Sequence, residues 1–327
     1  MKTFLFAAAL CLPFGSVIAE EKPTLTVYTY DSFISDWGPG PQIKAAFEAD
    51  CGCALNFVGA GDGAALLARL RLEGQHTKAD IVLGLDNSLM EQARQLELFA
   101  PLTQAPEGLE LPVSWQDDTF VPYDWGYLAF VYDNTKLSEL PSSFETLAAS
   151  DLTILIQDPR SSTPGLGLAL WVNAAYGDKA ANIWAGLSDN IVTVTKGWSE
   201  AYGLFLAGEA DLVLSYTTSP AYHLIAEDDA SKSAALFQEG HYLQIEVAAK
   251  LAGSKNPALA DAFMAFITSD DFQNVIPETN WMYPATGVET PELFGQMIAP
   301  QPVSGPLTIS DANRKAVVEE WVRALSQ

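Results

Sequence analysis

Short apolar runs rich in β-branched residues alternate with segments of helical periodicity along most of this chain. In the first part, strands are predicted at 25–29, 55–58 and 81–85, and helices at 42–49, 63–73 and 87–98. Such alternation produces a mostly parallel sheet with helices on both faces, so the sequence predicts an α/β fold.

The alternation resumes after a loop rich in Pro and Gly at residues 101–112. Strands are predicted at 127–132, 152–156, 191–195, 212–215 and 242–248, and helices at 144–149, 166–176, 179–187, 200–206, 221–227, 257–268 and 310–325. A mature chain of about 300 residues exceeds the size at which one core keeps growing. We therefore expect two lobes with a cleft between them.

The first 19 residues have the pattern of a secretory signal peptide. Lys2 precedes an apolar stretch from Phe4 to Val17, and small or apolar residues at Val17 and Ala19 precede a cleavage point before Glu20. The stretch is shorter than the roughly 20 residues of a membrane-spanning helix. Cys11 lacks the small preceding residue of a lipidation site. We expect an exported, soluble periplasmic protein.

The charge balance excludes two classes of partner. The chain has 41 acidic and 17 basic residues, for a formal net charge of -24. Such a surface repels nucleic acid and anionic lipid and tolerates cationic ligands. Much of this charge also serves solubility, so it identifies no ligand by itself.

Cys51 and Cys53 are the cysteines left after signal cleavage. Their C-x-C spacing suits neither a four-ligand zinc site nor a C-x-x-C redox pair. Oxidising surroundings favour a disulfide between them, whereas closure across one glycine demands a tight turn. The sequence leaves this pairing open.

In open α/β sheets, ligands bind beyond the carboxyl ends of the strands. One such loop, Ser161 to Gly167, places three hydroxyl groups and free amides before a helix, with Pro164 in its first turn. This arrangement favours an anion such as phosphate. The alternative is an ordinary helix N-cap.

Aromatic residues recur in the same strand-end loops. Trp37, Trp198 and Trp281 have Gly, Pro or polar neighbours, and Tyr30, Tyr216 and Tyr222 occur in similar stretches; the six are candidates for stacking on a flat or cationic ligand. The alternative is that each tryptophan covers a local core. Asp62 is either a plain N-cap or a ligand contact as well. His76, His223 and His241 are too widely spaced to predict a metal site or a catalytic relay.

Five segments extend this interpretation to a family. Residues 26–33, 37–41, 157–167, 195–202 and 215–222 resemble the periplasmic thiamine-binding proteins of enteric-type bacteria, and the resemblance covers nearly the whole mature chain. It implies the type 2 periplasmic-binding-protein fold, in which two α/β lobes joined by crossover strands close on a ligand. We accordingly expect a first lobe at 20–126 and 244–285 and a second lobe at 127–243, with the C-terminal helical segment 286–327 assigned to neither.

The resemblance also implies site residues. Matching motifs place ligand contacts at Asp62, Gly63, Ser162, Thr163, Trp198, Tyr216, Thr217, Thr218 and Ser219, and further cleft aromatics at Tyr30, Trp37, Tyr222 and Trp281. No metal, cofactor or catalytic residue is implied.

The implied function is capture of thiamine, with its monophosphate and diphosphate, by a monomer that delivers it to the permease subunits of an ABC transporter. Thiazolium and aminopyrimidine rings suit aromatic faces, an acid and hydroxyl groups. The alternatives are a binder of ferric ion or a polyamine on the same fold, and a thiaminase-like enzyme, which requires an activated cysteine nucleophile.

Overall fold

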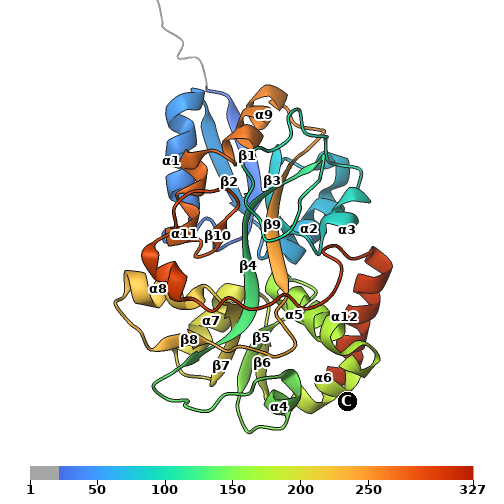
Figure 1. Ribbon diagram of the computed structural model, residues 1–327. Helices are drawn as coiled ribbons and strands as arrows, with labels where there is room; N and C mark the ends of the chain where they lie inside the picture. The colour runs from blue at the N-terminus through green and yellow to red at the C-terminus, as the bar shows by residue number, and fades with distance from the viewer. Residues whose placement is uncertain (1–21, 327) are drawn as a thin grey trace, which may run out of the picture.

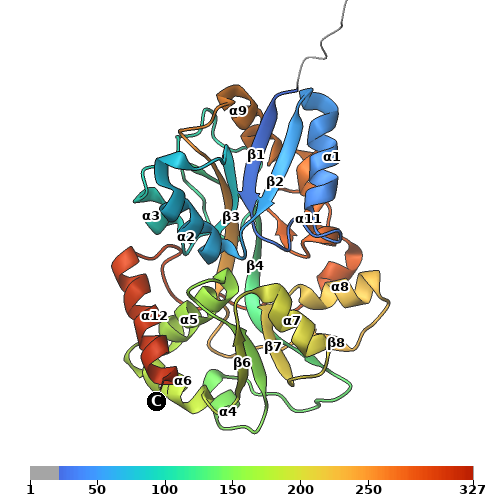
Figure 2. The same ribbon diagram turned by 180° about the vertical axis from the view of Figure 1, so that it is seen from behind.

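The structure is a computed structural model that describes residues 22–326. The predicted signal peptide at residues 1–19, and Cys11 within it, lie outside the described residues. Two α/β lobes lie one above the other, and strands β4 (Phe120–Asp133) and β9 (Leu243–Lys250) run between them (Figures 1 and 2). Among residues 22–326, no helix is long and apolar enough to cross a membrane.

The first lobe has a parallel core of three strands in the order β2-β1-β3. Its elements are β1 (Thr24–Thr29), α1 (Gly40–Cys51), β2 (Ala54–Gly59), α2 (Gly63–Glu73), η1 (Gly74–His76), β3 (Ile81–Asp86), α3 (Met90–Arg94), α9 (Pro257–Phe266), α10 (Asp270–Gln273), α11 (Ile276–Thr279) and β10 (Tyr283–Pro284). Strand β3 is buried along its whole length, as its uninterrupted apolar run predicts.

The second lobe repeats this plan with the parallel order β7-β5-β6. Its elements are α4 (Phe144–Ala148), β5 (Ile154–Gln157), α5 (Thr163–Tyr176), η2 (Gly177–Lys179), α6 (Ala180–Leu187), β6 (Ile191–Thr195), α7 (Trp198–Leu206), β7 (Leu212–Tyr216), α8 (Ser219–Ala226) and β8 (Lys232–Ala234). Trp171 is fully buried in its core and donates to the carbonyl oxygen of Gly240 at 2.8 Å.

Strand β4 belongs to both lobes. Its residues 120–127 pair with β9 and its residues 128–132 with β7, antiparallel in each case. The sequence predicted only 127–132 as strand, because Pro122 and Asp124 interrupt the apolar pattern. A register shift lies between these two residues, so the ladder tolerates a proline that has no N–H to donate.

The C-terminal segment connects the lobes and ends on the second. After η3 (Glu292–Gln296), residues 297–310 form no helix, so the expectation of a mostly helical segment holds only in part. Helix α12 (Asp311–Leu325) packs on α5 and α6, where Trp321 meets Trp184 edge to face at 6.4 Å. This contact assigns α12 to the second lobe.

The helix predicted at 87–98 is wrong in length, because α3 spans only five residues. The polar residues before it make tertiary hydrogen bonds instead. Asp86 accepts from the backbone N and Oγ of Ser88, and Asn87 accepts from Ile245 N and donates to the carbonyl oxygen of Leu307. These bonds hold residues 86–89 as a turn.

Asp86 makes stability depend on pH. Burial raises the pKa of this carboxyl to about 7, whereas the pKa of an aspartate in the unfolded chain is about 3.9. The folded protein therefore holds a proton that the unfolded chain releases, and the free energy of unfolding falls as pH rises from about 4 to about 7. Asp86→Asn removes this pH-dependent loss of stability, because asparagine does not titrate. We expect its stability relative to wild type to rise with pH, by up to about 1.4 kcal/mol per pH unit. Urea unfolding at pH 5, 6 and 7 measures this, and parallel curves would contradict it.

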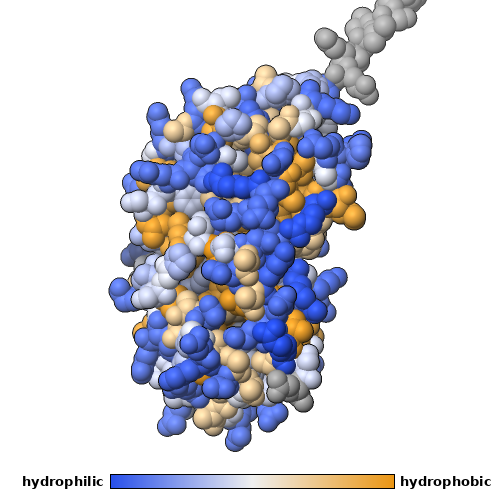
Figure 3. Space-filling view, turned by 90° about the vertical axis from the view of Figure 1, so that its right-hand side faces the viewer, coloured by the Kyte–Doolittle hydropathy of each residue, from blue (hydrophilic) through white to orange (hydrophobic). Residues whose placement is uncertain are grey.

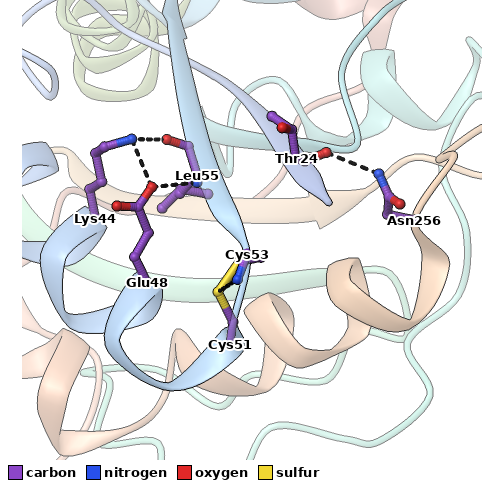
Figure 4. The surroundings of a disulfide bond; sticks show 7 residues. All are labelled: Thr24, Lys44, Glu48, Cys51, Cys53, Leu55 and Asn256. Atoms are coloured by element: carbon purple, nitrogen blue, oxygen red, sulfur yellow. Dashed lines mark hydrogen bonds and ion pairs between the residues drawn. A yellow bond between two sulfur atoms is a disulfide. The ribbon is translucent and has the colours of Figure 1, made fainter. Parts of the chain in front are cut away.

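A disulfide joins Cys51 and Cys53, which settles the pairing left open by the sequence (Figure 4). Gly52 between them has a φ of 61°, a left-handed conformation that glycine adopts without strain. The link lies where α1 passes into β2, beside the bond from Leu55 N to Glu48 at 2.7 Å.

The face of the molecule shown in Figure 3 is mostly hydrophilic. Hydrophobic residues form separate patches on this face. Among the exposed large apolar residues, Trp37 and Leu206 are half exposed and line the cavity described next.

Candidate functional site: the interlobe cavity

A cavity of about 280 Å³ lies between the lobes, near the lower end of the roughly 300–1,000 Å³ typical of small-molecule sites. Of the residues predicted from sequence, its lining includes Tyr30, Trp37, Asp62, Gly63, Thr163, Trp198, Tyr216, Ser219, Tyr222 and Trp281. Most of them follow the carboxyl ends of β1, β2, β5, β6 and β7, where the strand-end rule places ligands. Both lobes therefore contribute residues to the lining of this cavity.

Three predicted contacts do not line the cavity in this structure. Ser162, Thr217 and Thr218 are fully buried behind its wall. Thr217 donates its backbone N–H to the carbonyl oxygen of Tyr127, and the Thr218 hydroxyl points to the Met282 sulfur at 4.0 Å. The sequence motif located the right loop, but the turn before α8 directs these two hydroxyl groups into the protein.

Asp62 links the two lobes. It occupies the N-cap position of α2, yet its side chain makes no capping bond. One carboxylate oxygen instead accepts from Ser162 Oγ at 2.7 Å and from Trp198 N at 3.0 Å, both in the second lobe. Burial raises the pKa of Asp62, and these two hydrogen bonds oppose the rise. The plain N-cap interpretation is therefore wrong for this side chain.

The starts of α5 and α7 thus already hold an anion. Ser162 is the N-cap of α5 and accepts from Gly165 N at 3.5 Å, while Trp198 is the first residue of α7. Unpaired amides at helix starts attract negative charge. In this structure the Asp62 carboxylate fills the position that the sequence offered to a phosphate.

A series of neighbouring aromatic rings runs from Trp37 in the first lobe through the second lobe to Trp281 in the first lobe, and all of its members except His223 line the cavity. Centroid distances are 6.3 Å for Trp37 and Trp198, 5.0 Å for Trp198 and Tyr202, 5.9 Å for Tyr202 and His223, 4.9 Å for His223 and Tyr222, and 5.3 Å for Tyr222 and Trp281. The Trp198 and Tyr202 rings are stacked, and Trp198 Nε1 donates to Ser215 Oγ at 2.8 Å. This surface suits a flat or cationic ring.

Trp281 has a strained backbone. Its φ of 56° lies in the left-handed region, which a bulky side chain rarely adopts. The conformation turns the chain between α11 and β10, where Trp281 and Met282 both line the cavity. Strain of this kind is retained where surrounding structure fixes it, often at binding sites.

The sequence interpretation missed nine residues that line the cavity. They are Ser32, Pro164, Ser199, Tyr202, Gly203, Leu206, Glu246, Asn280 and Met282. Glu246 carried a signal, because a carboxylate within the apolar run 242–248 has no simple role in a buried strand. Asn280 and Met282 reach the cavity only through tertiary folding of the segment after α11.

Two of the three histidines, His223 and His241, have structural partners. His241 is buried between the carbonyl oxygen of Leu128 and Phe237 N. His223 bonds to Tyr202 and to Glu227, and although Asp229 lies near, both ring nitrogens are already engaged. His76 is exposed.

Two lobes joined by crossover strands around an interlobe cavity define a solute-binding protein of the periplasmic type, which confirms the predicted type 2 fold. The profile of the bacterial extracellular solute-binding proteins matches residues 76–304. The chain belongs to this family.

Similar proteins extend this result over the full length. The chain is 53% identical to the thiamine-binding periplasmic protein of Salmonella typhimurium, with 100% of each covered, and 54% identical to that of Escherichia coli, with 94% of each covered. A solved structure described as a periplasmic thiamin binding protein superposes with a TM-score of 0.90 at 52% identity, covering 97% of this chain and 100% of the other. The predictions of a solute-binding role and of a periplasmic location are confirmed.

Proposed function

We propose that this protein captures thiamine in the interlobe cavity and delivers it, as a monomer and without chemical change, to the permease subunits of an ABC importer. The supporting observation is the cavity itself, which is lined by aromatic rings and acidic groups from both lobes. Its relatives at about half identity over their full length carry thiamine in their names.

The chemistry of the lining suits this ligand. Thiamine has a flat aminopyrimidine and a permanently cationic thiazolium ring. Trp198, Tyr216 and Trp281 offer π faces, and Asp62 and Glu246 offer carboxyl groups. Rings of this kind attract a desolvated cation by about 2 kcal/mol each at best.

The rival ligands fit less well. Ferric ion requires deprotonated tyrosine oxygens. Here Tyr30 donates to Glu246 at 2.9 Å and Tyr222 donates to Glu227 at 2.9 Å, and burial raises the pKa of Tyr30 well above its usual range. A polyamine requires acids spread along its length, whereas aromatic rings make up much of this wall.

An enzymatic role on this fold lacks its nucleophile among the described residues. A thiaminase-like reaction requires a free cysteine thiolate near the ligand. Cys51 and Cys53 are bonded to each other at the end of α1 and do not line the cavity. This observation favours binding without turnover.

Titration of intrinsic tryptophan fluorescence tests thiamine and the rival ligands in one experiment. We expect saturable quenching by thiamine and no saturation by spermidine or ferric citrate at the same concentrations. Mass analysis after incubation with thiamine and an amine tests turnover. Recovery of unchanged thiamine supports a binder, and a substituted pyrimidine product would overturn it.

Phosphate esters of thiamine form the finer part of this proposal. An ester phosphate at the starts of α5 and α7 has to displace the Asp62 carboxylate or share its hydrogen-bond donors, Ser162 Oγ and Trp198 N. Two like charges this close repel strongly in a buried site. The charge of Asp62 therefore determines how well an ester competes with thiamine.

Asp62→Asn is expected to shift the preference toward thiamine monophosphate by about tenfold, the equivalent of about 1.4 kcal/mol. Asparagine keeps an acceptor for Ser162 and Trp198 but removes the charge. Calorimetric titration of both variants with thiamine and its monophosphate gives the ratio of affinities. An unchanged ratio would place the phosphate away from Asp62.

A further inference from the structure

Two buried carboxyl groups face each other on the strands that join the lobes. Asp124 on β4 and Glu246 on β9 are register partners, which places their side chains on the same face of the sheet (strands in Figure 1). Asp124 is fully buried, and Glu246 is 6% exposed and lines the interlobe cavity. Glu246 thus lies at the cavity, and Asp124 lies behind it on the other strand that joins the lobes.

Hydrogen bonds hold Glu246 as an acceptor. Tyr123 and Tyr30 donate their hydroxyl groups to Glu246 Oε2 at 2.6 and 2.9 Å, and Gln244 Nε2 donates to Oε1 at 3.3 Å. Donors on three sides favour the ionised carboxylate. Tyr216 and Gln244 continue this network at 2.9 Å toward the cavity.

Asp124 is held differently. Asn280 donates to its Oδ2 at 2.6 Å, while its Oδ1 is buried without a hydrogen-bond partner among the described residues. Burial and the charge of Glu246 raise the pKa of Asp124 well above its usual range, and burial raises the pKa of Glu246 to about 6. At neutral pH, Asp124 therefore keeps the proton and Glu246 carries the charge.

Among residues 22–326, no basic side chain is paired with Glu246 or Asp124. The charged side chains that act on Glu246, Asp124, Asp86 and Asp62 are other carboxyl groups. An ionised group in a site of low dielectric without a counter-ion is costly. The rings of Tyr216 and Trp281 line the cavity with Glu246, so a flat cation placed there gains both a counter-charge and stacking.

We propose that Glu246 is the counter-ion of the ligand's cationic ring, and that Asp124 is a positioning residue that keeps the charge on Glu246 by holding the shared proton. This assignment rests on the proposed function, because it takes the thiazolium ring as the occupant. This role makes Glu246, on a strand that joins the lobes, a specificity determinant in addition to the loop contacts implied by the sequence motifs.

The test compares thiamine with its neutral analogue, in which a thiophene ring replaces the thiazolium. We expect wild type to bind thiamine at least tenfold more tightly than the analogue by calorimetry. Glu246→Gln should lose at least tenfold for thiamine and less than about twofold for the analogue. The matched control is Asp80→Asn, the same loss of a buried carboxyl just before β3 and outside the cavity lining, which should change neither affinity by more than about threefold.

The pH profile tests the pair. Thiamine affinity of wild type should fall as pH drops below about 6, where Glu246 takes up a proton, and Glu246→Gln should lose this dependence between pH 5 and 7. Asp124→Asn replaces a protonated carboxyl by a neutral group of the same size, so the midpoint should stay near that of wild type, and a large shift would show that Asp124 does not hold the proton. Tyr30, Tyr123, Tyr216, Asp62 and Asp86 are the other titratable groups around Glu246, and they are unchanged in these variants.

The outcomes separate the two proposals. Binding of neither compound by wild type overturns the proposed function itself. Equal affinity of wild type for both compounds overturns the role of Glu246 alone. Equal losses for both compounds in Glu246→Gln, together with a lower melting temperature, would show a purely structural role and also overturn the inference.

Discussion

Replacing Trp198 by alanine is expected to weaken thiamine binding by tens-fold. The ring is partly exposed at the cavity wall and stacks on Tyr202. Loss of a tryptophan face beside a desolvated cation costs about 2 kcal/mol, and lost stacking adds to this. Calorimetric titration with thiamine measures the change. The backbone N–H of Trp198 that binds Asp62 remains in the variant.

Trp198→Phe is the matched control, since it keeps a π face but loses the Nε1 donor to Ser215. It should lose less affinity than the alanine variant. Normal thiamine binding by the alanine variant, with a sharp drop in melting temperature, would show that Trp198 supports the core and not the ligand.

Gly63→Ala is expected to lower thiamine affinity by about 10- to 100-fold. A Cβ atom at this position would lie 2.4 Å from the carbonyl oxygen of Gly84 in the same lobe and 2.6 Å from Thr163 Cγ2 in the other lobe. Overpacking of this kind typically costs 1–3 kcal/mol. The start of α2 has to shift away from Gly84, and the contact with Thr163 keeps the lobes apart. Titration gives the affinity, and small-angle X-ray scattering should show a larger radius of gyration.

Gly203→Ala supplies the control for this change. Gly203 lines the same cavity from α7, but a Cβ atom there meets nothing within 4 Å. Its affinity for thiamine should stay within about threefold of wild type. Similar losses in both variants would show that the cavity tolerates no added methyl group, and would argue against a special role of the lobe contact at Gly63.

The periodicity of apolar residues was sufficient to place most strands and helices, because each element has to bury one face of its own. The predicted bounds of an element were wrong where polar residues form hydrogen bonds with partners far away in the sequence. Asn87 binds Ile245 and Leu307, so the helix expected from residue 87 starts only at Met90. Strand β4 begins before its predicted start, since Pro122 lies at a register shift that the local pattern does not reveal.

The site divides in the same way. Aromatic residues at strand ends were identifiable because sheet topology brings those ends together, and Tyr30, Trp198 and Tyr216 do line one cavity. The direction in which a loop side chain points could not be identified from the sequence. Ser162 faces Asp62 and is closed off from the cavity, although its loop was identified.

The sequence by itself determined the alternating α/β pattern, the two-lobe size and the composition of the loops, since these depend on local periodicity and chain length. Only the tertiary structure decided which groups share one environment. Asp124 and Glu246 are more than a hundred residues apart, and the pairing of β4 with β9 makes them neighbours. Their ionisation depends on that pairing, because burial and the nearest charge determine a carboxyl pKa.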